Sequence, residues 1–176
     1  MWMDHRAKAE ADLINSGNHN VLKYVGGRLS PEMQIPKLLW LRENNPDTYR
    51  NAGYFMDLPD FLTYRATGRD IRSICSATCK WTYLAEENRW DPEFFGALSL
   101  EDLLEYEAVK IGRHIGNIGA TAGDLLPGLA KVFGLHSNVK VAISIIDAHA
   151  GTLGTIGARN LSVNTAFKKI WINIRN

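Results

Sequence analysis

Residues 139–154 read VKVAISIIDAHAGTLG, and the rest of the chain is interpreted outward from this stretch. Its first half alternates β-branched residues, a pattern typical of a strand buried between two layers. From Asp147 onward, small residues and glycines indicate a helix or a tight turn. Because ligands of open α/β sheets bind where strands end, Asp147 is a candidate catalytic or ligand-binding carboxylate. An N-cap of the following helix is the alternative interpretation.

The composition indicates one globular domain without a bulk electrostatic field. The chain has 176 residues, 45% of them hydrophobic, and 20 Lys and Arg against 19 Asp and Glu. A net charge of +1 argues against nucleic acid or an anionic membrane as partner. The apolar runs are far shorter than the ~20 residues of a membrane span, so we expect a cytoplasmic protein. Cys75 and Cys79 lack a second pair, which predicts reduced, partly buried thiols and no metal site.

Helix-capping residues and glycines mark several helices. The helices that we expect span residues 7–24 with a break near 16–18, 30–43 with an interruption at Pro36, 57–68, and 126–133. Ser30 should cap the second of these helices, and Asp57 the third. Trp40 should pack inward together with Leu38 and Leu41.

Later segments are less regular. Asp91 opens a helix that residues 99–104 should continue, and four glycines mark residues 112–123 as a loop. Residues 71–84 favour short segments, with Lys80 in the middle of an otherwise uncharged run. Because Lys is rarely buried without a partner, Lys80 is either paired or ligand-facing, or it extends its ammonium group to the surface.

The common enzyme motifs are absent from the sequence. There is no Gly-x-Ser-x-Gly, His-Glu-x-x-His, Gly-x-Gly-x-x-Gly or Gly-Lys-Ser/Thr. Gly151, Gly154 and Gly157 recur at every third position, which favours close helix packing over phosphate binding. His149 lies beside Asp147, but a lone His among small residues is more typical of a structural group than of a ligand.

Trp2, Lys80 and Asp147 each occupy an unusual position in their segments. A Trp face can pack on a sugar, a Lys can bind polyol oxygens or a developing anion, and an ionised Asp can accept a hydroxyl proton. Together they would suit the phosphorylation of a sugar hydroxyl, a reaction in which the protein mainly positions groups and stabilises charge.

Five ordered segments resemble the FGGY carbohydrate kinases, in particular the ribulokinase-like branch. They are WMDHRA (2–7), GGRLSPEMQIPKLLWL (26–41), DLPDFLTYRATG (57–68), CSATCKW (75–81) and IDAHAG (146–151). The resemblance implies an α/β fold of the actin-like, ribonuclease-H-like ATPase type, as part of the N-terminal domain of such a kinase. Residues 1–158 would form this partial sugar-binding domain, and residues 159–176 a divergent tail.

The resemblance also implies functional roles. Asp147 matches the catalytic base, Lys80 a lysine that contacts the ketose, and Trp2 a tryptophan of the sugar pocket. Asp4 and Arg6 belong to the same signature and would brace the pocket, with His149 in a supporting role. The implied reaction transfers the γ-phosphoryl group of ATP, with Mg²⁺, to a terminal hydroxyl of a ketopentose such as D-ribulose.

The sequence also departs from the family pattern. Members of this family usually begin with a glycine-containing phosphate hairpin, about a hundred residues before the Trp-Met-Asp signature, and continue into a second domain that binds adenosine. We therefore expect the chain to be the central part of a kinase. The alternative hypothesis is a non-catalytic truncated isoform or fragment that binds sugar or a protein partner. The choice of ketose and the oligomeric state, including a homo-oligomer, are left open.

Overall fold

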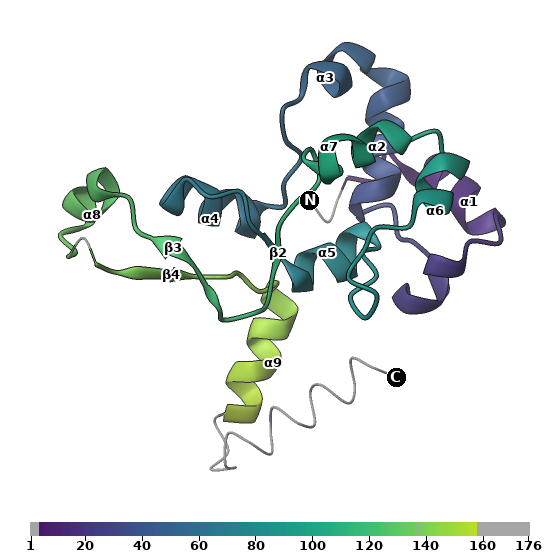
Figure 1. Cartoon of the computed structure of the whole chain (residues 1–176). Helices are drawn as coiled ribbons and strands as arrows, with labels where there is room; N and C mark the ends of the chain where they lie inside the picture. The colour runs from purple at the N-terminus through teal and green to yellow at the C-terminus, as the bar shows by residue number, and fades with distance from the viewer. Residues whose placement is uncertain (1–3, 137, 158–176) are drawn as a thin grey trace. The chain divides into compact units, whose positions relative to one another are not determined.

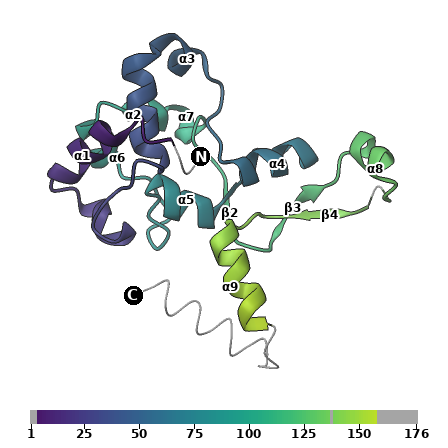
Figure 2. The ribbon, with the colours of Figure 1, turned by 180° about the vertical axis from the view of Figure 1, so that it is seen from behind.

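The computed structural model describes residues 4–136 and 138–157, and the chain divides into two compact units, Met1–Ser144 and Ile145–Asn176. Figures 1 and 2 show their elements from two sides. The helices of the first unit are α1 (Lys8–Ser16), the 3-10 helix η1 (Asn20–Val25), α2 (Gln34–Asn44), α3 (Pro46–Asn51), α4 (Leu58–Thr67), α5 (Ile74–Trp81), α6 (Pro92–Ala97), the 3-10 helix η2 (Glu101–Leu104), α7 (Glu105–Ala108) and α8 (Pro127–Phe133). Its strands are β1 (Arg72–Ser73), β2 (Ile115–Gly116), β3 (Thr121–Asp124) and β4 (Lys140–Ala142). The second unit contains α9 (Asp147–Gly157).

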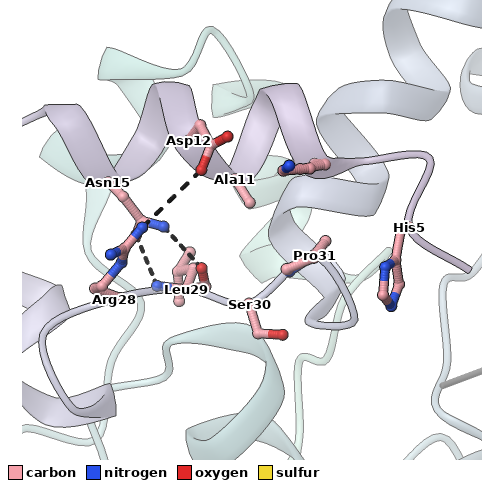
Figure 3. Close-up of a pocket in the computed structure, with 9 residues that line it drawn as sticks. His5, Ala11, Asp12, Asn15, Arg28, Leu29, Ser30 and Pro31 are labelled. Carbon is pink, nitrogen blue, oxygen red and sulfur yellow. Dashed lines mark hydrogen bonds and ion pairs between the residues drawn. The ribbon is translucent and has the colours of Figure 1, made fainter. Parts of the chain in front are cut away.

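The first helices end where the sequence predicts. α1 stops at Ser16 and η1 follows, which confirms the predicted break. Gly26 closes η1 with a left-handed backbone (φ 79°), a conformation that glycine adopts easily because it has no Cβ. Asn15 then fixes the next turn, since its amide donates to the Leu29 carbonyl at 2.8 Å and accepts from the Leu29 N–H at 2.7 Å (Figure 3).

α2 begins later than predicted. Its N-cap is Met33, so the expected helix start at Ser30 is wrong. Ser30 instead forms a turn in which its carbonyl accepts from the Met33 N–H at 2.9 Å. Pro36 does not interrupt the helix, because it occupies the third helical position, where a backbone N–H has no intrahelical partner in any case.

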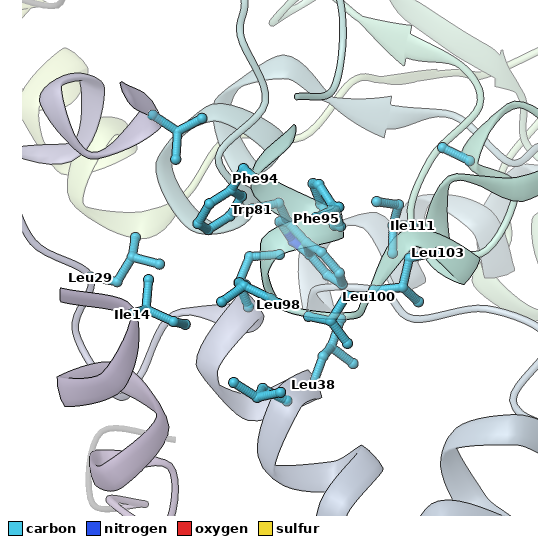
Figure 4. Close-up of a cluster of buried hydrophobic side chains, with 14 of the residues drawn as sticks. Ile14, Leu29, Leu38, Trp81, Phe94, Phe95, Leu98, Leu100, Leu103 and Ile111 are labelled. Atoms are coloured by element: carbon cyan, nitrogen blue, oxygen red, sulfur yellow. The ribbon is translucent and has the colours of Figure 1, made fainter. Parts of the chain in front are cut away.

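A buried apolar cluster joins α1, α2, α5, α6 and η2 (Figure 4). Leu38 lies inside this cluster and Leu41 packs at its edge, as predicted. Several of its large side chains are 0% exposed: Ile14, Ile35, Phe95, Leu100 and Leu103. Each side chain of this size stabilises the fold by ~1.5–3 kcal/mol when buried. The cluster therefore fixes the helices that carry the site residues of the first unit.

The predicted core strand is wrong in length and in burial. β4 covers only Lys140–Ala142 and pairs antiparallel with β3, with Asp124 opposite Lys140. Lys140 and Ala142 are exposed, and Val141 is half-buried. Alternating β-branched residues indicate a preference for a sheet, but they do not specify what covers its faces. In the described residues, α4 is the helix that packs on this two-stranded ribbon.

Two further predictions are corrected. Residues 112–123 are not a single loop, because β2 pairs in parallel with β1 and the beginning of β3 pairs with β4. Residues 99–104 do not continue α6, which ends at Ala97. Ser99 has a left-handed backbone (φ 53°) that breaks the helix, and η2 starts two residues later.

α4 has the predicted bounds, but it buries polar side chains and exposes apolar ones. Gly68 closes it in the left-handed conformation (φ 72°), as expected. Its buried residues are polar, namely Asp60, Thr63 and Thr67. Exposed residues of the same helix are large and apolar, namely Leu58, Phe61 and Leu62. Asp60 hydrogen-bonds outside the helix, to Ser73 and Ser144, whereas the hydroxyls of Thr63 and Thr67 donate to carbonyls of α4 itself.

α9 confirms the predicted change of structure at Asp147. Asp147 is its first residue, and the small residues that follow are helical. β4 ends at Ala142, so the prediction that Asp147 directly ends a strand is wrong.

Candidate functional site

Lys80 lies in the last turn of α5, a helix that is fixed at its start and at its end. At the start, the Ser73 Oγ caps the helix by accepting from the Cys75 N–H at 3.2 Å. At the end, the Trp81 side chain is 4% exposed and belongs to the apolar cluster. Lys80 is half-buried, and no hydrogen bond or ion pair reaches its ammonium group from residues 4–136 or 138–157. The described chain therefore does not pair Lys80 directly, and its charge can serve a ligand.

The two thiols of α5 are reduced, as predicted. Cys75 is buried and Cys79 is half-buried. A hydrogen bond between these thiols, together with burial, raises the pKa of Cys79. A thiol with a raised pKa is a poor nucleophile near neutral pH.

Asp57 joins α2, α4 and α5. It occupies the N-cap position of α4, but the prediction that its side chain caps that helix is wrong. Its Oδ2 accepts from the Trp81 Nε1–H at 2.8 Å, and its Oδ1 accepts from the Gln34 amide. Burial raises the pKa of Asp57, while these hydrogen bonds and the charges of Lys80 and Lys37 oppose the rise. The Asp57 carboxylate is thus held near Lys80, the candidate sugar-binding lysine.

Asp4 and Arg6 form a second polar group. The Arg6 Nε donates to Asp4 Oδ1 at 2.8 Å, and its Nη2 donates to Oδ2 at 2.6 Å. These hydrogen bonds hold the pKa of Asp4 well below its usual range. The guanidinium lies over the Trp40 ring, 4.7 Å from its centroid. Trp40 is half-buried beneath Arg6, so the prediction that it packs into the core is wrong.

One side of α2 connects these two groups. Gln34, Lys37 and Trp40 follow each other at intervals of three, which places them on neighbouring turns of the same side. The charge of Lys37 lowers the pKa of both Asp4 and Asp57. The sequence analysis missed Gln34, Lys37 and Asp57 as site residues. For Gln34 and Lys37 the sequence contains a usable pattern, because polar residues three apart next to the buried side of a helix indicate a polar face.

Asp60 organises the start of α5 from the third position of α4. Its side chain is 3% exposed. Its Oδ1 accepts from the Ser73 N–H at 2.9 Å and from the Ser144 hydroxyl at 3.0 Å. The Ser73 hydroxyl in turn donates to the Ser144 carbonyl at 2.6 Å. Burial raises the pKa of Asp60 to about 6.

The remaining predicted residues are Asp147, His149 and Trp2. Asp147 begins α9 of the second unit, where its Oδ1 accepts from the Ala148 N–H at 2.8 Å. His149 lies two positions later, and residues two apart on a helix do not face each other. The supporting role of His149 stays a prediction. Trp2 lies outside the described residues.

The described residues do not provide a fitted site for ATP and Mg²⁺. A Cβ built on Gly151 or Gly154 meets no atom within 4 Å, so these glycines do not form a close cradle for phosphate in the described part of the chain. The buried carboxylates of Asp57 and Asp60 are occupied by N–H and O–H donors instead of converging on a cation.

A cavity of about 410 Å³ lies elsewhere on the first unit (Figure 3). Its lining residues come from α1 and from the turn after η1: His5, Lys8, Ala11, Asp12, Asn15, Arg28, Leu29, Ser30 and Pro31. The two hydrogen bonds between the Asn15 amide and the Leu29 backbone join α1 to the turn after η1. Lys80, Asp4 and Arg6 are not among its described lining residues, so this cavity is distinct from the part of the predicted sugar site that they form.

Sequence comparison identifies relatives over most of the chain. Residues 1–154 match the model of the FGGY family of carbohydrate kinases, N-terminal domain. FGGY carbohydrate kinase domain-containing proteins of Xenopus laevis and Homo sapiens are each 51% identical over 160 residues, 90% of this chain and 29% of theirs. A D-ribulokinase of Saccharomyces cerevisiae is 40% identical over 171 residues, 90% of this chain and 24% of its own. The chain thus spans less than a third of the curated relatives that it matches.

Comparison with solved structures supports the fold. A gluconate kinase of Lactobacillus acidophilus superimposes with a TM-score of 0.73 at 20% identity, over 88% of this chain and 30% of that one. A xylulose kinase of the same organism gives 0.72 at 21% identity, over the same shares. The predicted fold class, part of an actin-like sugar-kinase N-terminal domain, is confirmed. Within the described ranges, every helix is too short or too polar to cross a membrane.

Proposed function

Because the chain belongs to the FGGY family of carbohydrate kinases, we propose that it provides the sugar-binding side and the general base of a kinase for a ketopentose. D-ribulose is the substrate that we propose first. The 40% identity to a D-ribulokinase over 90% of the chain carries this choice. Lys80 supports it, because a half-buried ammonium group that no described residue binds can donate to polyol oxygens.

In the proposed mechanism each residue has a limited task. Lys80 donates to oxygens of the ketose, and Trp2 packs on its carbon face. Asp4 and Arg6 brace the pocket through their paired hydrogen bonds. Asp147 accepts the proton of the terminal hydroxyl as that oxygen becomes the nucleophile. ATP with Mg²⁺ would be the phosphoryl donor, and no described residue is assigned a role toward it.

Binding of a pentulose panel to the purified chain tests the sugar side. Isothermal titration should show preference for D-ribulose over L-ribulose, D-xylulose and glycerol. Lys80→Ala should abolish measurable binding, whereas Lys131→Ala, an exposed lysine of α8, should not change it. A folded chain that binds no member of the panel, or binds equally after Lys80→Ala, would overturn the proposal.

Release of ADP tests whether the chain also catalyses. The chain is incubated with ATP, Mg²⁺ and the preferred pentulose, and ADP is followed by a coupled assay. Pentulose-dependent ADP release that is lost in Asp147→Asn would support the kinase. Sugar binding without ADP release would instead support the alternative, a non-catalytic sugar-binding chain.

A further inference from the structure

α5 is too short to hold its own position. It has eight residues, and isolated helices of this length are not stable in water. The orientation of Lys80 therefore depends on the contacts that fix the two ends of α5. Both ends are bound by carboxylates from the beginning of α4, at the N-cap and at the third helical position.

The start of α5 is bound by Asp60. This carboxylate accepts from the N–H of Ser73, the N-cap residue of α5, at 2.9 Å. The same oxygen accepts from the Ser144 hydroxyl, and the Ser73 hydroxyl donates to the Ser144 carbonyl. Asp60 and Ser73 are 3% and 0% exposed, so water does not compete for these hydrogen bonds.

The end of α5 is bound by Asp57. Its Oδ2 accepts from the indole N–H of Trp81, the last residue of the helix and the neighbour of Lys80. The next residue, Thr82, is buried in a left-handed conformation (φ 64°). This conformation is unfavourable for a β-branched residue, so the surroundings must impose it. The chain therefore turns at Thr82, directly after Trp81, whose indole N–H is bound by Asp57.

We propose that Asp57 and Asp60 act as a two-point clamp on α5 that positions Lys80 for the sugar. Neither acid touches the substrate in this proposal, so both are positioning residues. The proposal rests on the proposed function, because Lys80 is taken to be the sugar-binding lysine. Asp57 acts one residue from Lys80 and Asp60 acts at the opposite end of the helix, so loss of Asp57 should matter more.

Sugar affinity in clamp variants tests the proposal. At a temperature where every variant is folded, Asp57→Ala should weaken pentulose binding by roughly tenfold and Asp60→Ala by roughly threefold. Asp60→Asn should recover most of the affinity lost in Asp60→Ala, because its amide oxygen can still accept from Ser73 and Ser144. Asp47→Ala is the matched control, since Asp47 also lies in the first turn of a helix but pairs with Arg50.

A second readout separates this proposal from the proposed function. Hydrogen exchange of the α5 amides, followed by mass spectrometry without sugar, should accelerate in Asp57→Ala and Asp60→Ala but not in Asp47→Ala. Unchanged exchange would overturn the clamp whatever sugar binds. Faster exchange with unchanged affinity would overturn the positioning role while leaving the proposed function intact. If the unmodified chain binds no pentulose, the proposed function fails and the role toward sugar fails with it, while the exchange data still decide whether α5 is clamped.

Discussion

The surroundings of Lys80 and those of Asp147 differ in how far the chain itself determines them. Lys80 lies on a helix that is bound at both ends by buried carboxylates and anchored by Trp81 in the apolar cluster. Asp147 begins a helix of the second unit, and its carboxylate is hydrogen-bonded to the amide of the next residue. Lys80, the proposed sugar-binding lysine, therefore has a local framework, whereas the described residues supply the proposed base with a helix start.

This difference separates two kinds of site residue. Removing a framework residue such as Asp60 or Trp81 should change stability and local order, because buried groups lose their partners. Removing the proposed base should change chemistry and leave the fold almost unaltered. Substitutions of both kinds of residue test this contrast.

The largest effect is expected for Asp147→Asn in a full-length kinase that contains this sequence. A positioned general base typically contributes ~10²–10⁴ to the rate, and the amide cannot accept the proton. Turnover should fall by that factor while the pentulose dissociation constant stays within about twofold. Asp124→Asn, an exposed acid paired with Lys140, is the control. Normal turnover in Asp147→Asn would show that Asp147 is not the general base.

Asp60 should give the framework a distinctive pH dependence. Burial raises its pKa from 3.8 to about 6, so the folded state holds this proton more tightly than the unfolded chain. Stability from this group is fully present below about pH 4 and is lost as the pH rises toward 6. The shift corresponds to roughly 2–3 kcal/mol. Asp60→Asn, which does not titrate, should flatten this part of the stability profile.

Urea unfolding between about pH 4 and 7 measures that effect. Asp57, whose pKa burial also raises, should keep a smaller slope of the same sign in Asp60→Asn. Asp47→Asn serves as the exposed control and should retain the slope of the unmodified chain. An Asp60→Asn profile parallel to that of the unmodified chain would show that Asp60 is not the titrating group.

Trp81→Phe should weaken the same framework by less. The substitution retains an aromatic ring in the cluster but removes the N–H that donates to Asp57 at 2.8 Å. An unsatisfied half-buried carboxylate oxygen costs ~1–3 kcal/mol, which urea unfolding at pH 7 can resolve. Trp40→Phe is the matched control, because its ring stays beneath Arg6. Equal stability of the two variants would argue against the Asp57–Trp81 link.

The sequence predicted the helical part of this framework better than the contacts between its helices. Capping residues and glycines located α1, α4 and α8 because such signals act within a few residues. The hydrogen bond from Trp81 to Asp57 joins positions 24 apart, and that from Ser144 to Asp60 joins positions 84 apart. No local pattern encodes such pairs. Lys80 was singled out by its unusual surroundings, whereas Asp57 was interpreted as an ordinary cap.

The strand prediction failed for a related reason. Alternating β-branched residues at 139–146 show that the segment suits a sheet, yet three residues of it are paired in the structure. Burial of a strand depends on what covers it, and that information lies outside the segment. The change at Asp147 to a helix or a tight turn was predicted correctly, because small residues and an acidic first position act locally.

The smallest effect is expected for the stability of Asp147→Asn in this chain. It directly compares the residue at the start of α9 with the residues that hold α5. Asn and Asp are similarly good residues at a helix start, so the unfolding free energy should change by less than ~0.5 kcal/mol. The matched variant is Asp57→Asn, which places an amide donor against either Trp81 or Gln34 and should cost ~1–3 kcal/mol. Urea unfolding of both variants in the same buffer gives the two changes in unfolding free energy. A large loss for Asp147→Asn would mean that Asp147 also has a structural partner, and the distinction between a framework for Lys80 and a bare helix start for the base would no longer hold.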